Sequence, residues 1–179
     1  AAGWQDTAAG GAASASSNVR SAGVAFLAEA LSRLVDDDLE QVTQVLAALV
    51  APVSDPAALF DDTSLEALST CNGLVAALAR VGVGSGGTSI ASDSAAIVLS
   101  DLLETSIFDE AVVPTVMPTT NDTVRRLEES SVDASVVLLD TIDSLNKAQR
   151  DSVVSDEAPV GVVSTNVRTA SGRLTSLSV

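Results

Sequence analysis

Apolar residues recur along much of the chain at steps of three and four positions, the spacing that places side chains on one face of an α-helix. Four such stripes consist of Val24, Leu27, Leu31 and Leu34; Leu39, Val42, Leu46 and Leu49; Leu65, Leu68, Cys71, Val75 and Leu78; and Ala96, Leu99, Leu103 and Ile107. They predict four amphipathic helices, the first over residues 18–35. We expect Pro52 to end the second helix and the glycines of residues 82–87 to end the third. Ser92 or Asp93 is the expected cap of the fourth.

A fifth and longer stripe follows, and its members are Val124, Leu127, Ser131, Ala134, Leu138, Ile142, Leu145 and Ala148. It predicts a helix of roughly 30 residues, about 45 Å long, that begins near Asn121 and ends at Arg150. After residues 156–159 the helical period disappears and β-branched residues become frequent among Ser, Thr and Gly. This texture is typical of one or two β-strands.

The order of these elements predicts a mainly α fold of about five helices in a bundle, the last one long, with a short C-terminal β segment able to join a sandwich. We divide the chain into a flexible linker (residues 1–17), a helical domain (18–157) and a β segment (158–179) that begins or borders a further β domain. We predict a linker at residues 1–17 because they are small and polar and show no regular spacing of apolar positions. The first residues, which include neither an initiating Met nor a signal peptide, favour a processed product or a piece of a longer protein.

Composition narrows the chemistry that this fold can carry. Apolar residues make up 46% of the chain but aromatic residues only 2%, so the core must be built from Ala, Val, Leu and Ile. The chain has no His and one Cys, which excludes imidazole chemistry, zinc clusters and disulfide scaffolds. A net charge of −15 disfavours binding to nucleic acid or anionic membranes. The longest uncharged stretch, residues 41–54, is too short for the ~20 residues of a membrane span, so we expect no membrane insertion.

Two acidic clusters, residues 36–38 and residues 61–62, are candidates for a Ca²⁺ site because hard cations prefer carboxylate oxygens. The alternating acids and central glycine of an EF-hand loop are absent, and both clusters directly precede predicted helices. We therefore interpret them as helix caps, with a metal site as the alternative. Asp140 and Asp143 lie three positions apart on the long helix, where we expect a solvated face. We expect no metal and no cofactor.

Catalytic candidates are few. A serine nucleophile needs a base, and without His the candidates are Lys147 and carboxylates; no Gly-x-Ser-x-Gly pattern is present. The sequence GVGSGG of residues 82–87 lacks the Lys-Ser/Thr ending of a phosphate-binding loop and follows a predicted helix, so we interpret it as a connecting loop. Cys71 belongs to an apolar stripe, where a free cysteine behaves as a small hydrophobe, with an intermolecular disulfide as the alternative. We expect no enzymatic activity.

One modification motif is present. Asn121, Asp122 and Thr123 form the only N-glycosylation sequon of the chain. It follows Pro114 and Pro118 in a segment where we expect an exposed backbone, which makes Asn121 a candidate glycosylation site in a secreted protein.

Residues 136–179 read VVLLDTIDSLNKAQRDSVVSDEAPVGVVSTNVRTASGRLTSLSV. This stretch is similar to the place where the helical subdomain of a GAIN-type (autoproteolysis-inducing) domain passes into its β-sandwich, as a Leu/Asp-rich helix followed by a Glu-Ala-Pro-Val segment and a strand. The residues that carry the likeness are Asp140, Leu145, Glu157, Ala158, Pro159, Ser164, Thr165, Asn166 and Val167. The preceding helices resemble the same region of polycystin-like and egg-jelly-receptor-like cell-surface proteins. GAIN domains cleave themselves at a His-Leu-Ser/Thr tripeptide, which this chain lacks; the resemblance therefore implies a non-cleaving relative or a β part that continues beyond Val179.

The resemblance implies a stalk-like extracellular position in an adhesion or mechanosensing protein. The leading hypothesis is a non-catalytic structural or interaction module of a large extracellular or cell-surface protein, polycystin-like and in a ciliary or flagellar setting. Its expected partners are neighbouring domains or subunits of a larger assembly. The alternative is a freestanding acidic helical adaptor or filament subunit that assembles through its Val- and Leu-rich stripes.

Overall fold

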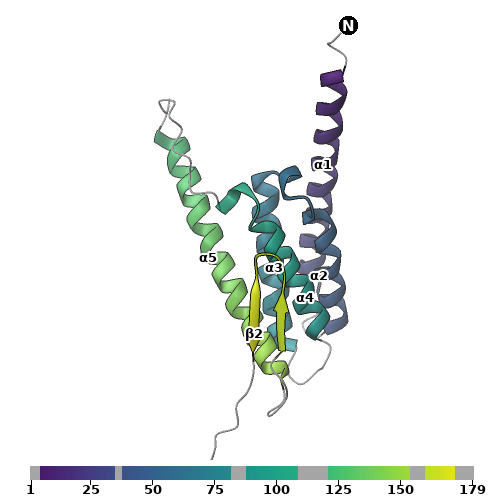
Figure 1. The fold of residues 1–179 in the computed structure, drawn as a ribbon, viewed down its shortest axis with the longest axis vertical. Helices are drawn as coiled ribbons and strands as arrows, with labels where there is room; N and C mark the ends of the chain where they lie inside the picture. Colours follow the sequence, from purple (N-terminus) through teal and green to yellow (C-terminus); the bar gives the residue numbers. More distant parts are fainter. Residues whose placement is uncertain (1–4, 35–37, 82–87, 109–120, 154–159, 172–179) are drawn as a thin grey trace, which may run out of the picture.

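Five α-helices and a two-stranded antiparallel sheet make up the part of the chain that the structure describes (Figure 1). The computed structural model describes the backbone of residues 5–34, 38–81, 88–108, 121–153 and 160–171, and the side chains of residues 15–34, 38–81, 89–108, 134–153 and 161–170. In chain order the elements are α1 (Gln5–Ser32), α2 (Leu39–Val53), η1 (Pro56–Ala58), α3 (Asp61–Val81), α4 (Thr88–Leu102), η2 (Ser106–Phe108), α5 (Asn121–Ser152), β1 (Val160–Val163) and β2 (Arg168–Ser171). A mainly α fold with a short C-terminal β segment is confirmed.

The first helix is longer than expected. α1 begins at Gln5, so much of the stretch expected to be a flexible linker is helical. Residues 5–17 hold five alanines, and alanine stabilises a helix through its intrinsic propensity, without needing an apolar stripe. The packed part of the helix includes Ser17 and Val24, which are buried. Figure 1 shows the preceding purple turns extending beyond the other helices.

The second helix ends close to the predicted position. Pro52 does not stop α2 but lies inside its last turn, and the helix continues to Val53. Pro52 has no N–H to donate along the helix, yet full burial of Val53 holds this turn against the core. At the other end, Asp38 is the N-cap.

The fourth helix begins four residues before the expected cap. α4 starts at Thr88, so the prediction that Ser92 or Asp93 caps it is wrong. Ser92 is instead buried inside the helix, beside the fully buried Ala91 and Ala95. Packing of these small residues against the core extends the helix through a Ser/Thr-rich stretch whose own helix propensity is modest.

α3 lies at the centre of the bundle and contacts each of the other four α-helices. The largest fully buried side chains are aliphatic apart from one glutamine, as the composition requires; they are Leu46, Leu49, Leu68, Leu74, Leu78, Leu99, Leu102, Leu145, Gln149, Val24, Val42 and Val53. α1 approaches α3 closely at Gly73, where an added Cβ would lie 2.6 Å from Cδ2 of Leu31. A side chain at this position would force the Cδ2 methyl of Leu31 to shift.

The β segment forms a hairpin that packs on the helices. β1 pairs with β2 from Val160 opposite Ser171 to Val163 opposite Arg168. Val162 and Val167 are buried in the same apolar cluster as the helices. The residues between the strands lie against α4, and β2 lies against α5 (Figure 1). The hairpin therefore shares the core of the bundle, and its extension into a larger sheet stays a prediction.

Candidate functional site

The acidic cluster before α2 acts in part as predicted. Oδ1 of Asp38 accepts a hydrogen bond of 3.1 Å from the backbone N–H of Gln41 and thereby caps the helix. This carboxylate also lies at the positive end of the helix dipole, where a negative charge is favourable. The cap prediction is confirmed for Asp38, and residues 36 and 37 lie outside the described residues.

The second acidic cluster lies inside its helix instead of before it. Asp61 and Asp62 occupy the first turn of α3, which begins two residues before Thr63. The backbone N–H of Ser64 donates to the carbonyl of Phe60, so the helical hydrogen bonds already start there. Asp61 accepts a hydrogen bond from the hydroxyl of Ser106 in η2. Both carboxylates therefore lie at the positive end of the helix dipole, Asp61 also bonds a neighbouring element, and the N-cap prediction is wrong for them.

The described residues do not bring acids together around one point. Within these ranges no group of three or more Asp, Glu, Cys or His side chains is placed to hold a metal ion. Asp140 and Asp143 are both exposed on α5, as predicted. Asp140 accepts a hydrogen bond of 3.2 Å from Nδ2 of Asn72 on α3 and so links the two helices at their surface.

Cys71 is fully buried on α3, as its place in the apolar stripe predicts. Burial raises the pKa of its thiol to about 12, because the thiolate would lose its hydration inside the core. A nucleophilic cysteine needs the thiolate, which is favoured by nearby positive charge and partial exposure. Cys71 is therefore a packing residue of the core.

Ser144 and Lys147 stand in a Ser-x-x-Lys order on α5, which the sequence-based search for nucleophiles overlooked. In serine enzymes with this order the lysine serves as a base or proton relay inside an enclosed site. The side chain of Lys147 is exposed on the helix, so it lacks such an enclosure. Ser92, another serine singled out from the sequence, is buried and its hydroxyl has no partner among the described residues. Among the described side chains, neither serine lies beside a base that could activate it.

Two further predictions concern the ends of helices. Asn121 is the first residue of α5, and its side chain lies outside the described side chains. The glycosylation prediction therefore stays a prediction. The glycine-rich loop of residues 82–87 also lies outside the described residues.

A polar cluster joins the hairpin to the helices. Nδ2 of Asn166 donates to the carbonyl of Ser100 at 3.1 Å and to Oε1 of Glu104 at 3.0 Å. On the other side, the hydroxyl of Thr169 donates to Oε1 of Gln149 at 2.9 Å. Partial burial, and then the neighbouring charge of Glu104, raise the pKa of Asp101 on the same stretch of α4. The bonds of Asn166 and Thr169 join the hairpin to the helices, whereas Nε2 of Gln149 is buried without a partner among the described residues.

A concave surface lies between α1 and α2, and we call it the α1–α2 groove. Its volume is about 680 Å³. The lining residues are Ala15, Ser16, Val19, Arg20, Gly23, Phe26, Leu27, Ala48, Ala51 and Pro52. Val19 and Phe26 are each 73% exposed, although most of the large apolar side chains of α1 and α2 contribute to the core. The groove is therefore an apolar surface left in contact with water.

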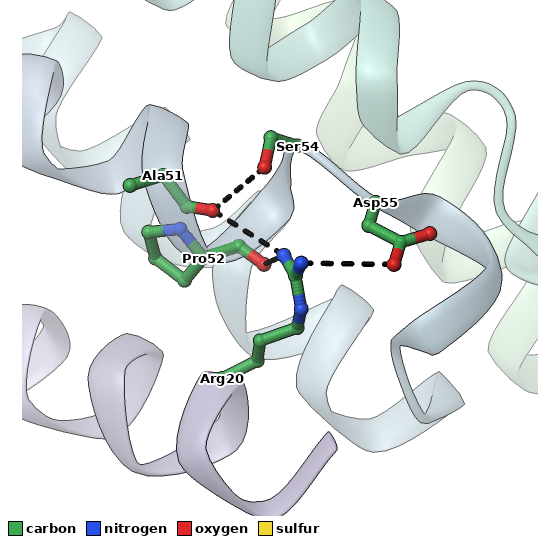
Figure 2. A network of polar contacts seen from close by, with 5 residues as sticks. All are labelled: Arg20, Ala51, Pro52, Ser54 and Asp55. Atoms are coloured by element: carbon green, nitrogen blue, oxygen red, sulfur yellow. Dashed lines mark hydrogen bonds and ion pairs between the residues drawn. The ribbon is translucent and has the colours of Figure 1, made fainter. Parts of the chain in front are cut away.

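Arg20 is the charged member of this lining, and its guanidinium is already engaged (Figure 2). Nη1 donates to the carbonyl of Pro52 at 2.9 Å and to that of Ala51 at 3.3 Å. Nη2 lies 3.6 Å from Oδ2 of Asp55. A cation that bonds the last carbonyls of a helix is favourably placed at the negative end of its dipole. Arg20 thus links α1 to the end of α2 and stabilises the packing of the two helices below the groove.

Sequence reasoning missed this groove. The stripe of Val24, Leu27, Leu31 and Leu34 marks the face of α1 that enters the core, and Val19 and Phe26 fall outside it. The available signal was the spacing of Val19, Gly23 and Phe26 at steps of four and three, which defines a second apolar line on the same helix. Single exposed apolar residues are common, so the spacing becomes informative only once α2 is seen beside it.

Comparison of the chain with protein-family models, curated proteins and solved structures gave no match. Among the helices that the structure describes, none combines the length and the apolar character needed to cross a bilayer.

Proposed function

We propose that the chain is a non-catalytic structural or interaction module of a large extracellular or cell-surface protein. This proposal depends on the α1–α2 groove, where Val19 and Phe26 are exposed to solvent beside other apolar lining residues. Contiguous exposed apolar surface is unfavourable for an isolated protein and is typical of protein–protein contact sites. The partners in this proposal are neighbouring domains or subunits of a larger assembly.

The extracellular setting is supported by the sequence. The stretch of residues 136–179 resembles the end of the helical part of a GAIN-type region in polycystin-like proteins, and Asn121 carries a sequon. The net charge of −15 favours a role away from nucleic acid and anionic lipid surfaces. A freestanding acidic adaptor or filament subunit would use the same groove, so the two hypotheses differ in the size and location of the native protein.

The mass of the native protein tests the setting. An antibody against residues 38–81 should detect, in the cells that make the protein, a species far larger than 18.0 kDa. That species should be accessible from outside intact cells, and its mass should fall on treatment with an N-glycosidase. A cytosolic species near 18.0 kDa that does not respond to the glycosidase would support the freestanding adaptor instead.

Site-directed photo-cross-linking tests the interaction role. A benzoylphenylalanine in place of Phe26 should form a discrete protein adduct within the native assembly, because the side chain stands at the groove. The same probe in place of Leu139, which is 67% exposed on α5, is the matched control and should not form that adduct. Equal adducts from both positions, or none from position 26, would contradict a role for the groove in binding.

A further inference from the structure

Asn72 and Gly73 form the only Asn-Gly pair of the chain, and they lie in the middle of α3. An asparagine followed by glycine is especially prone to deamidation, because glycine has no side chain to shield its backbone nitrogen. That nitrogen attacks Cγ of the asparagine, so an N–Cγ bond forms and the Cγ–Nδ2 bond breaks to release ammonia. Water then opens the cyclic imide at either carbonyl, which gives aspartate or the β-linked isoaspartate.

The folded helix suppresses this reaction. Inside an α-helix the N–H of Gly73 donates to a carbonyl one turn earlier, and the helical φ and ψ of Asn72 do not permit the five-membered ring. The leaving group is engaged as well, since Nδ2 of Asn72 donates to Oδ2 of Asp140 at 3.2 Å. Because α3 contacts every other α-helix, the imide forms only when the centre of the bundle opens.

Both residues of the pair have a packing role. A Cβ added at Gly73 would lie 2.6 Å from Cδ2 of Leu31, so a side chain here would disturb the contact of α1 with α3. Asn72 supplies the amide that links α3 to Asp140 on α5. The two residues that make these helix contacts are therefore the same two that make the chain chemically labile.

The product of the reaction does not fit the place of the amide. Oδ1 of Asn72 is buried and has no donor among the described residues, so a carboxylate would place charge on a desolvated oxygen. Its other oxygen would take the place of Nδ2 and face the carboxylate of Asp140, which replaces a hydrogen bond by repulsion. Isoaspartate adds a methylene to the main chain and so interrupts the hydrogen bonds of α3.

We propose that Asn72 is a deamidation site controlled by the opening of α3, and that its reaction makes an episode of unfolding irreversible. While the bundle is closed, the helix holds Asn72 in an unreactive state. Once α3 opens, the imide forms, and a chain with aspartate or isoaspartate at position 72 refolds to a less stable structure. Repeated opening thus converts the protein into a weakened form with water as the only co-reactant.

The rate of deamidation tests this control. The full chain is incubated at mildly alkaline pH over a series of urea concentrations, digested under acidic conditions and analysed by mass spectrometry. We expect Asn72 to react at least about tenfold faster in the unfolded chain, because the rate follows the population of the open form. Leu46→Ala, which removes core contacts of α2, should shift the rate and the unfolded fraction together to lower urea concentration.

Asn166, which precedes valine, is the internal control and should stay largely intact in every sample. Equal rates for Asn72 in buffer and in urea, or an intact Asn72 in the unfolded chain, would overturn the proposal. A rate that does not shift with the unfolding curve of Leu46→Ala would overturn it as well.

Variants test the misfit of the product. Asn72→Asp reproduces the aspartate form and should lower the melting temperature by at least about 2 °C. Adding Asp140→Asn places one amide opposite one carboxylate again and should recover part of that loss. Asp143→Asn removes the same charge from another exposed position of α5 and is the matched control, which should recover less. An unchanged melting temperature in Asn72→Asp, or equal recovery by the two α5 variants, would overturn the irreversible step.

Discussion

Arg20 joins the body of α1 to the last turn of α2, and replacing it by methionine tests how the two helices are held (Figure 2). Methionine keeps an unbranched stem in place and removes the guanidinium. The loss includes a 2.9 Å hydrogen bond to the carbonyl of Pro52 and a 3.3 Å bond to that of Ala51. Ala51 keeps a second donor, the hydroxyl of Ser54 at 2.9 Å, so the bond to Pro52 dominates.

The expected magnitude follows from these contacts. A hydrogen bond from a charged donor contributes about 1.5–3 kcal/mol, and the Arg20 side chain is only 21% exposed. Its ion pair with Asp55 spans 3.6 Å and involves a side chain that is 52% exposed, so water screens it and it contributes about 0–1 kcal/mol. We therefore expect Arg20→Met to lower the free energy of unfolding by about 2 kcal/mol and Asp55→Asn to lower it by less than about 1 kcal/mol.

Urea unfolding followed by far-ultraviolet circular dichroism measures both variants against the native chain. The effect of Asp55→Asn should shrink further at high NaCl, whereas that of Arg20→Met should persist because a partly buried hydrogen bond is screened less. A loss below about 0.5 kcal/mol in Arg20→Met would refute the reasoning, since a surface substitution without structural partners has an effect of that size. Equal losses in the two variants would show that the ion pair, and not the carbonyl bonds, holds the helices.

Three further predictions concern the core and the charge. Leu46→Ala, at a fully buried position of α2, should lower the free energy of unfolding by about 2–5 kcal/mol in urea titration. Leu138→Ala, at a partly buried position of α5, should lower it by less. The reverse order would contradict the packing of α2 and α5. The Cys71 thiol should resist a disulfide reagent in the native state and react only on unfolding. Its contribution to stability should be constant below its ordinary pKa of 9.0 and should fall as the pH rises toward 12, because the unfolded chain loses the proton first; rapid labelling of the native chain would contradict its burial. Finally, the melting temperature should rise with NaCl, which screens a net charge of −15, and micromolar CaCl₂ at matched ionic strength should add little; a shift of several degrees that a chelator reverses would reveal a calcium site.

Periodicity predicted the parts of the fold that depend on local pattern. Val24, Leu46, Leu68 and Cys71 all lie in predicted stripes and all are buried. The cap of α2 was also predictable, because an aspartate before an apolar run has a local role that Asp38 fulfils.

The features that escaped prediction arise from competition between local and tertiary effects. The early start of α1 depends on alanine propensity, which leaves no stripe, and the early start of α4 depends on the burial of Ala91 and Ala95. The bonds of Asn166 to Ser100 and Glu104 join residues more than sixty positions apart, and no spacing along the chain predicts them. The α1–α2 groove is likewise a tertiary feature, because Phe26 lines it only when α2 packs beside α1.

The hairpin has a consequence for how the fold opens. Val162 and Val167 are its buried apolar residues in the described part of the chain, and its remaining attachment is a few hydrogen bonds through Ser164, Asn166 and Thr169. An element held by so little apolar area has a low free energy of local opening compared with the helices around α3. We therefore expect the hairpin to open as a weaker cooperative unit, with its amide protons exchanging through detachment from α4 and α5 while the bundle stays folded. Because Thr169 bonds Gln149, detachment is expected to expose the end of α5, and the free energy of local opening is expected to be lower at the hairpin than in the helices around α3.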